Sequence, residues 1–411
     1  MRGDLQARAN AALDRLCGDL NRIGIALSGG GDSVALLHLT ASWAGGRRLM
    51  AASVDHGLRP ESAAEAARAG EMARGLGLPH DVLTWDRGAD QAGNLMANAR
   101  DARRGLLGAW ARENALEAVL LGHTEDDLAE TLLMRLSRGA GLEGLAGMEE
   151  GIRAEGTLFL RPLLALGRAE LRAWLTAQGA VWADDPSNDD PRFERARTRR
   201  AIAALGLPAS ALALSASHLR AASAALGEIA QRAAQGATFY AGALRIDRHA
   251  FADSPAEIRR RILLAGARTI TGQPYAPRRS QTSHALEKVD QGRRATLDGA
   301  VIERRGDWLQ FAREPRAAFA ANIAHEESTI WDNRWEISGL AHGDEVTALG
   351  FEALAGLDWR GADLSRDQAA SLPALRRGGH LIAAPHLLNS AAARFAPLRN
   401  AADFHDLLGQ H

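Results

Sequence analysis

Cysteine and lysine are almost absent from this sequence of 411 residues, which contains one of each, Cys17 and Lys288. A single cysteine excludes an internal disulfide and any metal cluster built on cysteines, and the simplest expectation for Cys17 is a small buried hydrophobic residue. Apolar runs of about 18 or more residues are also missing, so no membrane-spanning helix is expected. The first residues are spaced as on an amphipathic helix and unlike a secretory signal. These absences favour a cytoplasmic protein.

Arginine carries nearly all of the positive charge, since Lys288 is the only lysine among 49 basic residues. Arginine suits bidentate contacts with phosphate and stacking on bases. A genome-wide codon preference is the simpler explanation for the overall excess, and acidic residues balance it to a net charge of -1. Local clusters of arginine are therefore more informative about function than the total.

The first part of the chain alternates short apolar runs with segments of helical periodicity. The runs cover 23–27, 49–54 and 118–121, and the helical segments lie around 32–44, 60–76 and 94–114. Short buried strands that alternate with helices are typical of an α/β fold with a parallel, doubly wound sheet. The sequence therefore predicts this class for its N-terminal part.

The length of the chain exceeds what one ordinary core holds, so two or three domains are expected. The α/β pattern fades after about residue 185, and residues 206–268 are rich in Ala and Leu at helical spacing. Short β-like runs follow near 295–311, and 329–337 alternates as an exposed strand would. We expect an α/β domain over 1–205, a helical domain over 206–318 and a small mixed α+β domain over 319–411.

A glycine-rich loop, SGGGDS at residues 28–33, lies between the first predicted strand and a helix expected to start at Asp32 or Ser33. Glycines allow close backbone approach, and the N–H groups at a helix start attract phosphate. A Walker A loop is excluded because no lysine is near. A Rossmann fingerprint lacks its third glycine, although Asp55 could serve as the ribose-binding acid. A turn with Asp32 and Ser33 as helix caps is the structural alternative, but it does not need three glycines.

Two further strand ends carry polar residues where ligands of parallel sheets bind. Asp55 and His56 end the second strand, although Asp55 could simply cap the next turn. After the third strand, Asp126, Asp127 and Glu130 share one helix face beside His123. These carboxylates could bind Mg²⁺ or orient an attacking amine. Thr124 and Asp127 also have near capping-box spacing, but a cap would need only one acid.

The loop S-G-G-x-D-S resembles that of the ATP pyrophosphatases, or PP-loop enzymes. This resemblance implies an adenine nucleotide α-hydrolase-like sheet and a loop that holds the phosphates leaving as pyrophosphate, while the α-phosphate is transferred to the substrate. It implies that Asp32 helps to hold Mg²⁺. The expected nucleotide-binding residues are Ser28, Gly29, Gly30, Gly31, Asp32, Ser33, Asp55 and His56.

An ordered series of motifs over roughly the first 200 residues resembles the bacterial tRNA(Ile)-lysidine synthetases. The motifs are SGGGDS at 28–33, VDHGLR at 54–59, GHTEDDLAET at 122–131, RGAGLEGLAGM at 138–148, RPLL at 161–164 and DPSN at 185–188. The family adenylates the C2 carbonyl oxygen of the first anticodon cytidine in the CAU-anticodon tRNA(Ile), and free L-lysine then attacks C2 as AMP leaves.

The resemblance also implies roles for individual residues. Asp32 and Asp127 are expected to be metal-binding or catalytic carboxylates. A lysine amine with a pKa of roughly 10.4 must lose a proton before it attacks. His123, Asp126 and Glu130 are the candidates to deprotonate or position it, and the sequence does not choose between them. ATP and Mg²⁺ are the expected cofactors.

Arginines cluster where tRNA contacts are expected. The segment 191–200 contains five of them against one acid, an electrostatic footprint for phosphates. The family pattern R-N-x-[IVL]-R has Ala196 here in place of its asparagine, and A-R-x-x-R-Y has Arg104 in place of its tyrosine. The expected tRNA-binding residues are Arg100, Arg103, Arg138, Arg192, Arg195, Arg197, Arg199 and Arg200.

Other functions remain as alternatives. A tRNA thiolase such as a 2-thiocytidine synthetase uses paired cysteines or an Fe–S cluster, which a lone Cys17 cannot supply. A non-catalytic nucleotide- or RNA-binding module would not need the acidic set, yet Asp32, Asp127 and Glu130 all match the family. The oligomeric state stays open, with a homodimer as one option.

Overall fold

The structure, a computed structural model, describes residues 4–57, 62–86, 95–183, 190–273, 275–321 and 328–409. The chain forms two compact units, Met1–Arg220 and Ala221–His411. The division falls within helix α9 (Ala209–Ala233). The domain boundaries expected at 205/206 and 318/319 stay predictions.

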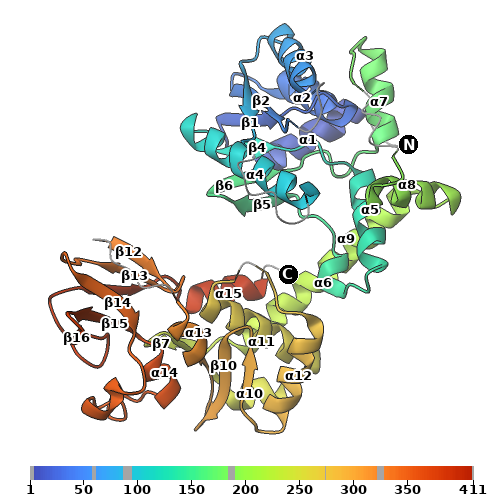
Figure 1. The fold of residues 1–411 in the computed structure, drawn as a ribbon. Coiled ribbons are helices and arrows are strands. Elements are labelled where there is room, and N and C mark those ends of the chain that lie inside the picture. Colours follow the sequence, from blue (N-terminus) through green and yellow to red (C-terminus); the bar gives the residue numbers. More distant parts are fainter. Residues whose placement is uncertain are drawn as a thin grey trace. The chain divides into compact units, whose positions relative to one another are not determined.

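A six-stranded sheet forms the centre of the first unit, with strand order β3-β2-β1-β4-β6-β5. Neighbouring strands are parallel except for β5, which runs antiparallel to β6. Figure 1 shows these strands and the helices around them. The α/β class with a doubly wound sheet is confirmed. The strands are β1 (Arg22–Ala26), β2 (Arg48–Asp55), β3 (His80–Thr84), β4 (Ala118–Leu120), β5 (Gly151–Ala154) and β6 (Thr157–Leu160).

Both faces of this sheet are covered, which explains why its strands read as unbroken apolar runs. Ile23 and Ile25 of β1 face one core, and Ala26 faces the other. The first core also takes residues from α1 (Leu5–Cys17), α2 (Gly31–Trp43), α3 (Ser62–Gly75) and α7 (Arg168–Ala177), and the second takes residues from α4 (Leu95–Glu113).

Strand β1 lies at the switch point of the sheet. The chain passes from β1 to β2 and β3 on one side and returns to β4 on the other. A crevice opens at the carboxyl ends of strands where the order reverses in this way. The segments that follow β1 and β4 therefore meet at this edge, and they are the loop SGGGDS and the acidic segment GHTEDD.

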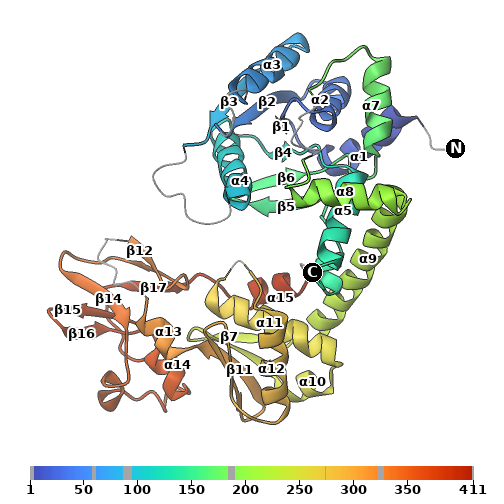
Figure 2. The same ribbon diagram turned by 45° about the vertical axis from the view of Figure 1, so that its right-hand side comes forward.

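Three further helices of the first unit follow β4 and β6. They are α5 (Glu125–Leu136), α6 (Leu142–Leu145) and α8 (Glu194–Ala204). Helix α8 packs on α5 and α7 packs on α2, as both ribbon views show (Figure 2). These contacts bring α7 and α8 to the edge of the sheet that carries the two loops.

The second unit begins with an antiparallel sheet of order β7-β8-β11-β10-β9 covered by helices. Its core also takes Phe404 and Leu408 from α15, the last helix of the chain. The elements are β7 (Thr238–Tyr240), β8 (Ala243–Asp247), α10 (Arg248–Asp253), α11 (Ala256–Thr271), α12 (Arg279–Asp290), β9 (Ala295–Leu297), β10 (Ala300–Arg305), β11 (Trp308–Arg313), α13 (Pro315–Phe319) and α15 (Ala401–Gly409).

Helices are present over 206–268 as expected, but strands β7 and β8 interrupt the helical spacing predicted there. Ala241 and Gly242 both adopt positive φ, at 49° and 71°, and form a tight turn between the two strands. Such two-residue turns match the twist of antiparallel strands. The alanine-rich composition hid this hairpin from the sequence pattern.

A separate core fills the rest of the second unit, with two three-stranded antiparallel sheets, β12-β13-β17 and β14-β15-β16. Residues 329–337 are not one exposed strand, because Asp332 and Asn333 adopt positive φ and reverse the chain. Trp331 and Trp335 on the two arms are buried. The elements are β12 (Ser328–Trp331), β13 (Trp335–Ser338), β14 (Asp344–Ala348), η2 (Ala353–Gly356), α14 (Arg366–Ala370), β15 (Pro373–Arg377), β16 (His380–Ala383) and β17 (Arg394–Pro397).

Two expectations drawn from the composition can be compared with the structure. Cys17 is fully buried, and burial raises the pKa of its thiol to about 11, so it behaves as an inert hydrophobic residue as predicted. In the described ranges, no single helix is long and apolar enough to cross a membrane. Helices α8 and α9 reach the necessary length and apolar character only when they are counted as one segment, and they are bent by 110° relative to each other.

Candidate active site

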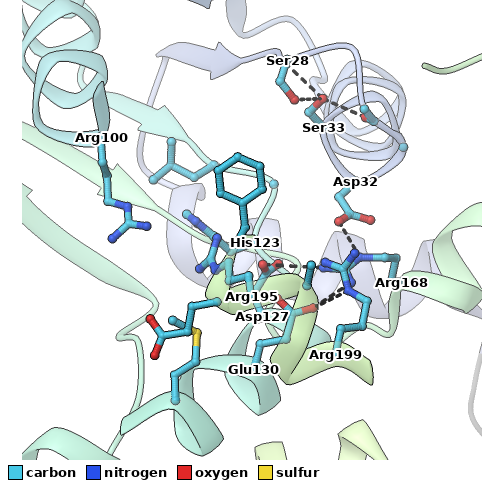
Figure 3. A pocket seen from close by; sticks show the side chains of 18 of the residues that line it. Ser28, Asp32, Ser33, Arg100, His123, Asp127, Glu130, Arg168, Arg195 and Arg199 are labelled. Carbon is cyan, nitrogen blue, oxygen red and sulfur yellow. Dashed lines mark hydrogen bonds and ion pairs between the residues drawn. The ribbon is translucent and has the colours of Figure 1, made fainter. Parts of the chain in front are cut away.

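The loop after β1 forms a phosphate-sized cradle at the start of α2. Gly29 has a φ of +82°, which favours glycine. The N-cap of α2 is Gly30, which has no side chain to cap the first N–H groups of the helix, so it leaves them accessible to an anion. Ser28 N donates to Ser33 Oγ at 3.2 Å, and Ser33 Oγ donates to the carbonyl oxygen of Gly30 at 2.9 Å (Figure 3). The two serines therefore fix the loop from within.

The segment after β4 approaches this loop closely. A Cβ atom on Gly122 would lie 3.0 Å from the backbone oxygen of Asp32 and 3.1 Å from the Cα atom of Ser33. Glycine suits this approach, since a side chain here would have to push backbone atoms aside by a few tenths of an ångström. The next residue, His123, and the first turn of α5 are thus held beside the start of α2.

Asp127 caps α5 and also faces the site. Its Oδ2 atom accepts hydrogen bonds from Thr124 N at 2.9 Å and Thr124 Oγ1 at 3.0 Å, which forms the capping box expected from the sequence. Its Oδ1 atom lies 3.6 Å from Arg168 Nη2. The capping and functional readings of Asp127 are therefore compatible, because each uses a different oxygen.

Arg168 lies among the acidic side chains at the centre of the site (Figure 3). Its Nε atom is 3.0 Å from Asp32 Oδ2 and its Nη1 atom is 3.1 Å from Glu130 Oε1. The guanidinium thus contacts carboxylates that come from α2 and α5, and its side chain is only 16% exposed. Sequence reasoning missed this residue. Its position in the sequence could have indicated it, because Arg168 is the first residue of the helix that follows β6. Strand β6 is another parallel strand that ends at the same edge of the sheet.

Asp126 has a different place from the other acids of α5. Its Oδ2 atom accepts a hydrogen bond from the backbone N–H of Arg168 at 2.7 Å. Arg168 is the first residue of α7 and the N-cap before it is Gly167, so Asp126 satisfies one of the unpaired N–H groups of that helix. This contact positions Arg168.

Burial and charge shift the pKa values of these groups in opposite directions. Burial raises the pKa of Asp32, and Arg168 only partly offsets this. Burial also acts to raise the pKa of Asp127, but the neighbouring positive charges, including Arg168, outweigh it and the pKa is lowered. The acids around Arg168 raise its pKa despite burial, so it stays charged.

Burial lowers the pKa of His123 to about 4, although the charge of Asp127 acts in the other direction. The imidazole is therefore neutral near pH 7. Its Nδ1 atom is buried without a hydrogen-bond partner among the described residues. A neutral ring beside the two loops is able to accept a proton.

A cavity of about 1090 Å³ joins these elements, a volume at the upper end for small-molecule sites. Arginines outnumber acids along it, which suits a polyanionic ligand. The sequence-predicted residues that line it are Ser28, Gly30, Gly31, Asp32, Ser33, Arg100, Arg103, His123, Asp127, Glu130, Arg138, Arg192, Arg195, Arg197 and Arg199. Arg168, Arg172, Phe193 and Glu194 line it as well.

Some predicted site residues do not line this cavity in the part of the chain that the structure describes: Gly29, Asp55, His56, Asp126 and Arg200. Asp55 accepts hydrogen bonds from Gly57 N at 2.9 Å and Ser62 Oγ at 2.5 Å, the local turn that was the alternative to nucleotide binding. The roles of these residues stay predictions. The DPSN motif at 185–188 lies outside the described residues.

The arginines of α8 and its approach have distinct partners. Arg199 Nε lies 2.9 Å from Glu130 Oε1, Arg138 pairs with Glu194, and Arg192 pairs with Asp190 at 2.6 Å. Arg197 donates to backbone carbonyl oxygens at the start of the helix. Within the described ranges Arg195 has no ion-pair partner, so it is the most readily available of the cluster for a phosphate.

The acidic set can be tested for its fit to Mg²⁺. No three His, Cys, Asp or Glu side chains in the described parts of the chain are grouped so as to hold a metal on their own. However, Asp32 Oδ1 and Glu130 Oε2 are buried oxygens without a hydrogen-bond partner in the part of the chain that the structure describes. Mg²⁺ commonly binds through one or two carboxylates together with substrate phosphates. The residues therefore fit a metal that shares its ligands with a nucleotide.

Comparison with known proteins gives the family. Residues 2–205 match the model of the PP-loop domain, which confirms the predicted use of ATP. The chain is 42% identical to the tRNA(Ile)-lysidine synthase of Ruegeria pomeroyi, over 89% of this chain and 88% of that protein. It is 40% identical to that of a Bradyrhizobium species over 68% of this chain and 82% of that protein, and 32% identical to that of Wolbachia pipientis over 78% of both.

The ordered motifs, the sheet and its loops, and these identities agree. The resemblance stated from the sequence is confirmed, and the chain belongs to the family of tRNA(Ile)-lysidine synthases, which are tRNA-modifying ligases.

Proposed function

We propose that this chain joins free L-lysine to C2 of the first anticodon cytidine of the CAU-anticodon tRNA(Ile), through a base adenylated by ATP, with release of AMP and pyrophosphate. One observation carries the proposal beyond family membership. The loop SGGGDS, the carboxylates of α5 and the arginines of α8 line a single cavity. A nucleotide, an amine and an RNA phosphate each require one of these three groups.

The first step is adenylation of the base. The C2 carbonyl oxygen of cytidine attacks the α-phosphorus of ATP, an O–P bond forms, and the bond to the β-phosphate breaks as pyrophosphate leaves. N–H groups at the start of α2 and the arginines of the cavity stabilise the developing negative charge. Asp32 and Asp127 would hold Mg²⁺, which supplies further charge neutralisation for the leaving pyrophosphate.

The second step transfers lysine. Its ε-amine, after losing a proton, attacks C2, the C2–O bond breaks, and AMP leaves with the electron pair. Arg168 and Arg199 both contact Oε1 of Glu130, and its Oε2 is buried without a hydrogen-bond partner among the described residues, which favours a role of Oε2 in holding the lysine ammonium. His123 lines the cavity and is neutral, but its pKa of about 4 makes it a weak base, so we propose that it orients the amine and that water takes the proton.

The tRNA is the third substrate. Arg100, Arg103 and Arg195 line the cavity on α4 and α8, and we assign them to phosphates around the anticodon. We propose phosphate contacts, on the same grounds, for the other cavity-lining arginines of the predicted set, Arg138, Arg192, Arg197 and Arg199. A homodimer and a cytoplasmic location stay predictions.

Labelled lysine tests the reaction directly. With ATP, Mg²⁺ and tRNA(Ile) transcripts, label should enter the transcript with a CAU anticodon and not one with GAU. Asp32→Asn should lower pyrophosphate release by at least about 100-fold, since it removes a carboxylate assigned to the Mg²⁺ that neutralises the leaving pyrophosphate, while tRNA affinity stays within about twofold. Asp19→Asn, an exposed acid at the end of α1, is the control. If no lysine enters the tRNA, the proposal is wrong.

The low pKa of His123 predicts a pH dependence of stability. The folded chain binds this proton more weakly than the unfolded chain, whose pKa is near 6.5. Stability is therefore highest above about pH 6.5 and falls as the pH drops toward about 4, by up to ~1.4 kcal/mol per pH unit from this group.

Chemical unfolding between about pH 7 and pH 5 measures this effect. His123→Gln should lose less stability over the range than the unmodified chain, and His249→Gln, an exposed histidine, should follow the unmodified chain. Parallel curves for His123→Gln and the unmodified chain would mean that His123 titrates as an ordinary histidine.

Salt dependence of tRNA binding tests the arginines. Each phosphate contact contributes roughly one unit to the slope of log affinity against log salt concentration. Arg195→Gln should therefore weaken tRNA binding and reduce the slope by about one unit. Arg153→Gln, an exposed arginine on β5, should leave the slope unchanged. An unaltered slope in Arg195→Gln would show that Arg195 touches no phosphate.

A further inference from the structure

The position of Arg168 has a consequence for metal binding. Its guanidinium contacts Asp32, Asp127 and Glu130, at N–O distances of 3.0, 3.6 and 3.1 Å. Two of them, Asp32 and Asp127, are the carboxylates assigned to the divalent cation in the proposed function, and Glu130 lies beside them. A positive group thus already lies where the cation would neutralise the same negative charges.

Two oxygens of this group point to a ligand beyond Arg168. Asp32 Oδ1 and Glu130 Oε2 are buried and lack hydrogen-bond partners among the described residues, and the Glu130 side chain is only 2% exposed. Leaving a buried charged acceptor unpaired is costly. Arg168 therefore satisfies only one oxygen of each of these two carboxylates.

Arg168 and a divalent cation compete for this place. Mg²⁺ requires oxygens at about 2.0–2.1 Å, and it repels a guanidinium held within hydrogen-bond distance of the same oxygens. With Arg168 among them, the carboxylates do not form a metal site in the described residues. Phosphates of a nucleotide supply both further metal ligands and an alternative, bidentate partner for arginine.

We propose that Arg168 takes the place of the divalent cation in the nucleotide-free protein and moves to the nucleotide phosphates when ATP binds, so that the metal enters with ATP and not before it. The inference rests on the metal role of Asp32 in the proposed function. Arg168 is then a positioning residue that keeps the carboxylates together between catalytic cycles and blocks metal binding without substrate.

Mn²⁺ binding to the full-length chain, followed by EPR without nucleotide, tests this inference. The unmodified chain and Asp32→Asn should leave the same concentration of free Mn²⁺, since neither binds the ion at this place. Arg168→Gln should bind Mn²⁺ at least about tenfold more tightly than the unmodified chain. Arg168→Lys keeps a cation there and should exclude Mn²⁺. Arg172→Gln, which removes a positive charge from the same helix and cavity, is the matched control and should gain no such site.

Two results would overturn the inference. One is Mn²⁺ binding by the unmodified chain without nucleotide that Asp32→Asn abolishes, a measurement that does not depend on the folding of any Arg168 variant. The other is a folded Arg168→Gln that gains no Mn²⁺ site. Lysine transfer to tRNA is measured separately, so failure of the inference and failure of the proposed reaction are distinguishable.

Discussion

The ion pairs of Arg168 with three carboxylates are the interaction on which the site depends. Asp32, Asp127 and Glu130 are largely buried, and without a cation among them their mutual repulsion would favour protonation. Because the attraction between the buried charges is largely offset by the cost of taking them out of water, such a cluster adds little net stability. Its effect is positional, since one guanidinium fixes the relation of α2 to α5 and places both beside the phosphate cradle.

Close backbone approach makes this arrangement attainable. Strand β1 is central in the sheet, and the loops after β1 and β4 meet because Gly122 carries no side chain. Gly29 and Gly30 shape the loop, and Gly30 places no side chain of its own over the start of α2. Asp126 then holds the start of α7, so that Arg168 is directed toward the carboxylates. The groups needed for the proposed reaction come together because the parallel strands β1, β4 and β6 end at the same edge of the sheet.

Much of the site was predictable because its residues follow strands with strong apolar patterns. Asp32, His123, Asp127 and Glu130 line one cavity for this reason. The sequence could not separate Asp126 from its neighbours, because its partner is a backbone N–H of α7, about 40 residues away in the chain. Arg168 was missed because only its place after β6 marks it. The hairpin of β7 and β8 was hidden because alanine-rich segments suit helices in most contexts.

The central claim is that Arg168 and the carboxylates act as one electrostatic unit, and a double-mutant cycle of Arg168→Gln and Glu130→Gln measures it most directly. Free energies of unfolding would be determined for the unmodified chain, the two single variants and the double variant. The account predicts that the double variant loses less stability than the sum of the single losses, with a coupling energy of ~1–3 kcal/mol. Losses that add to within about 0.5 kcal/mol would contradict it.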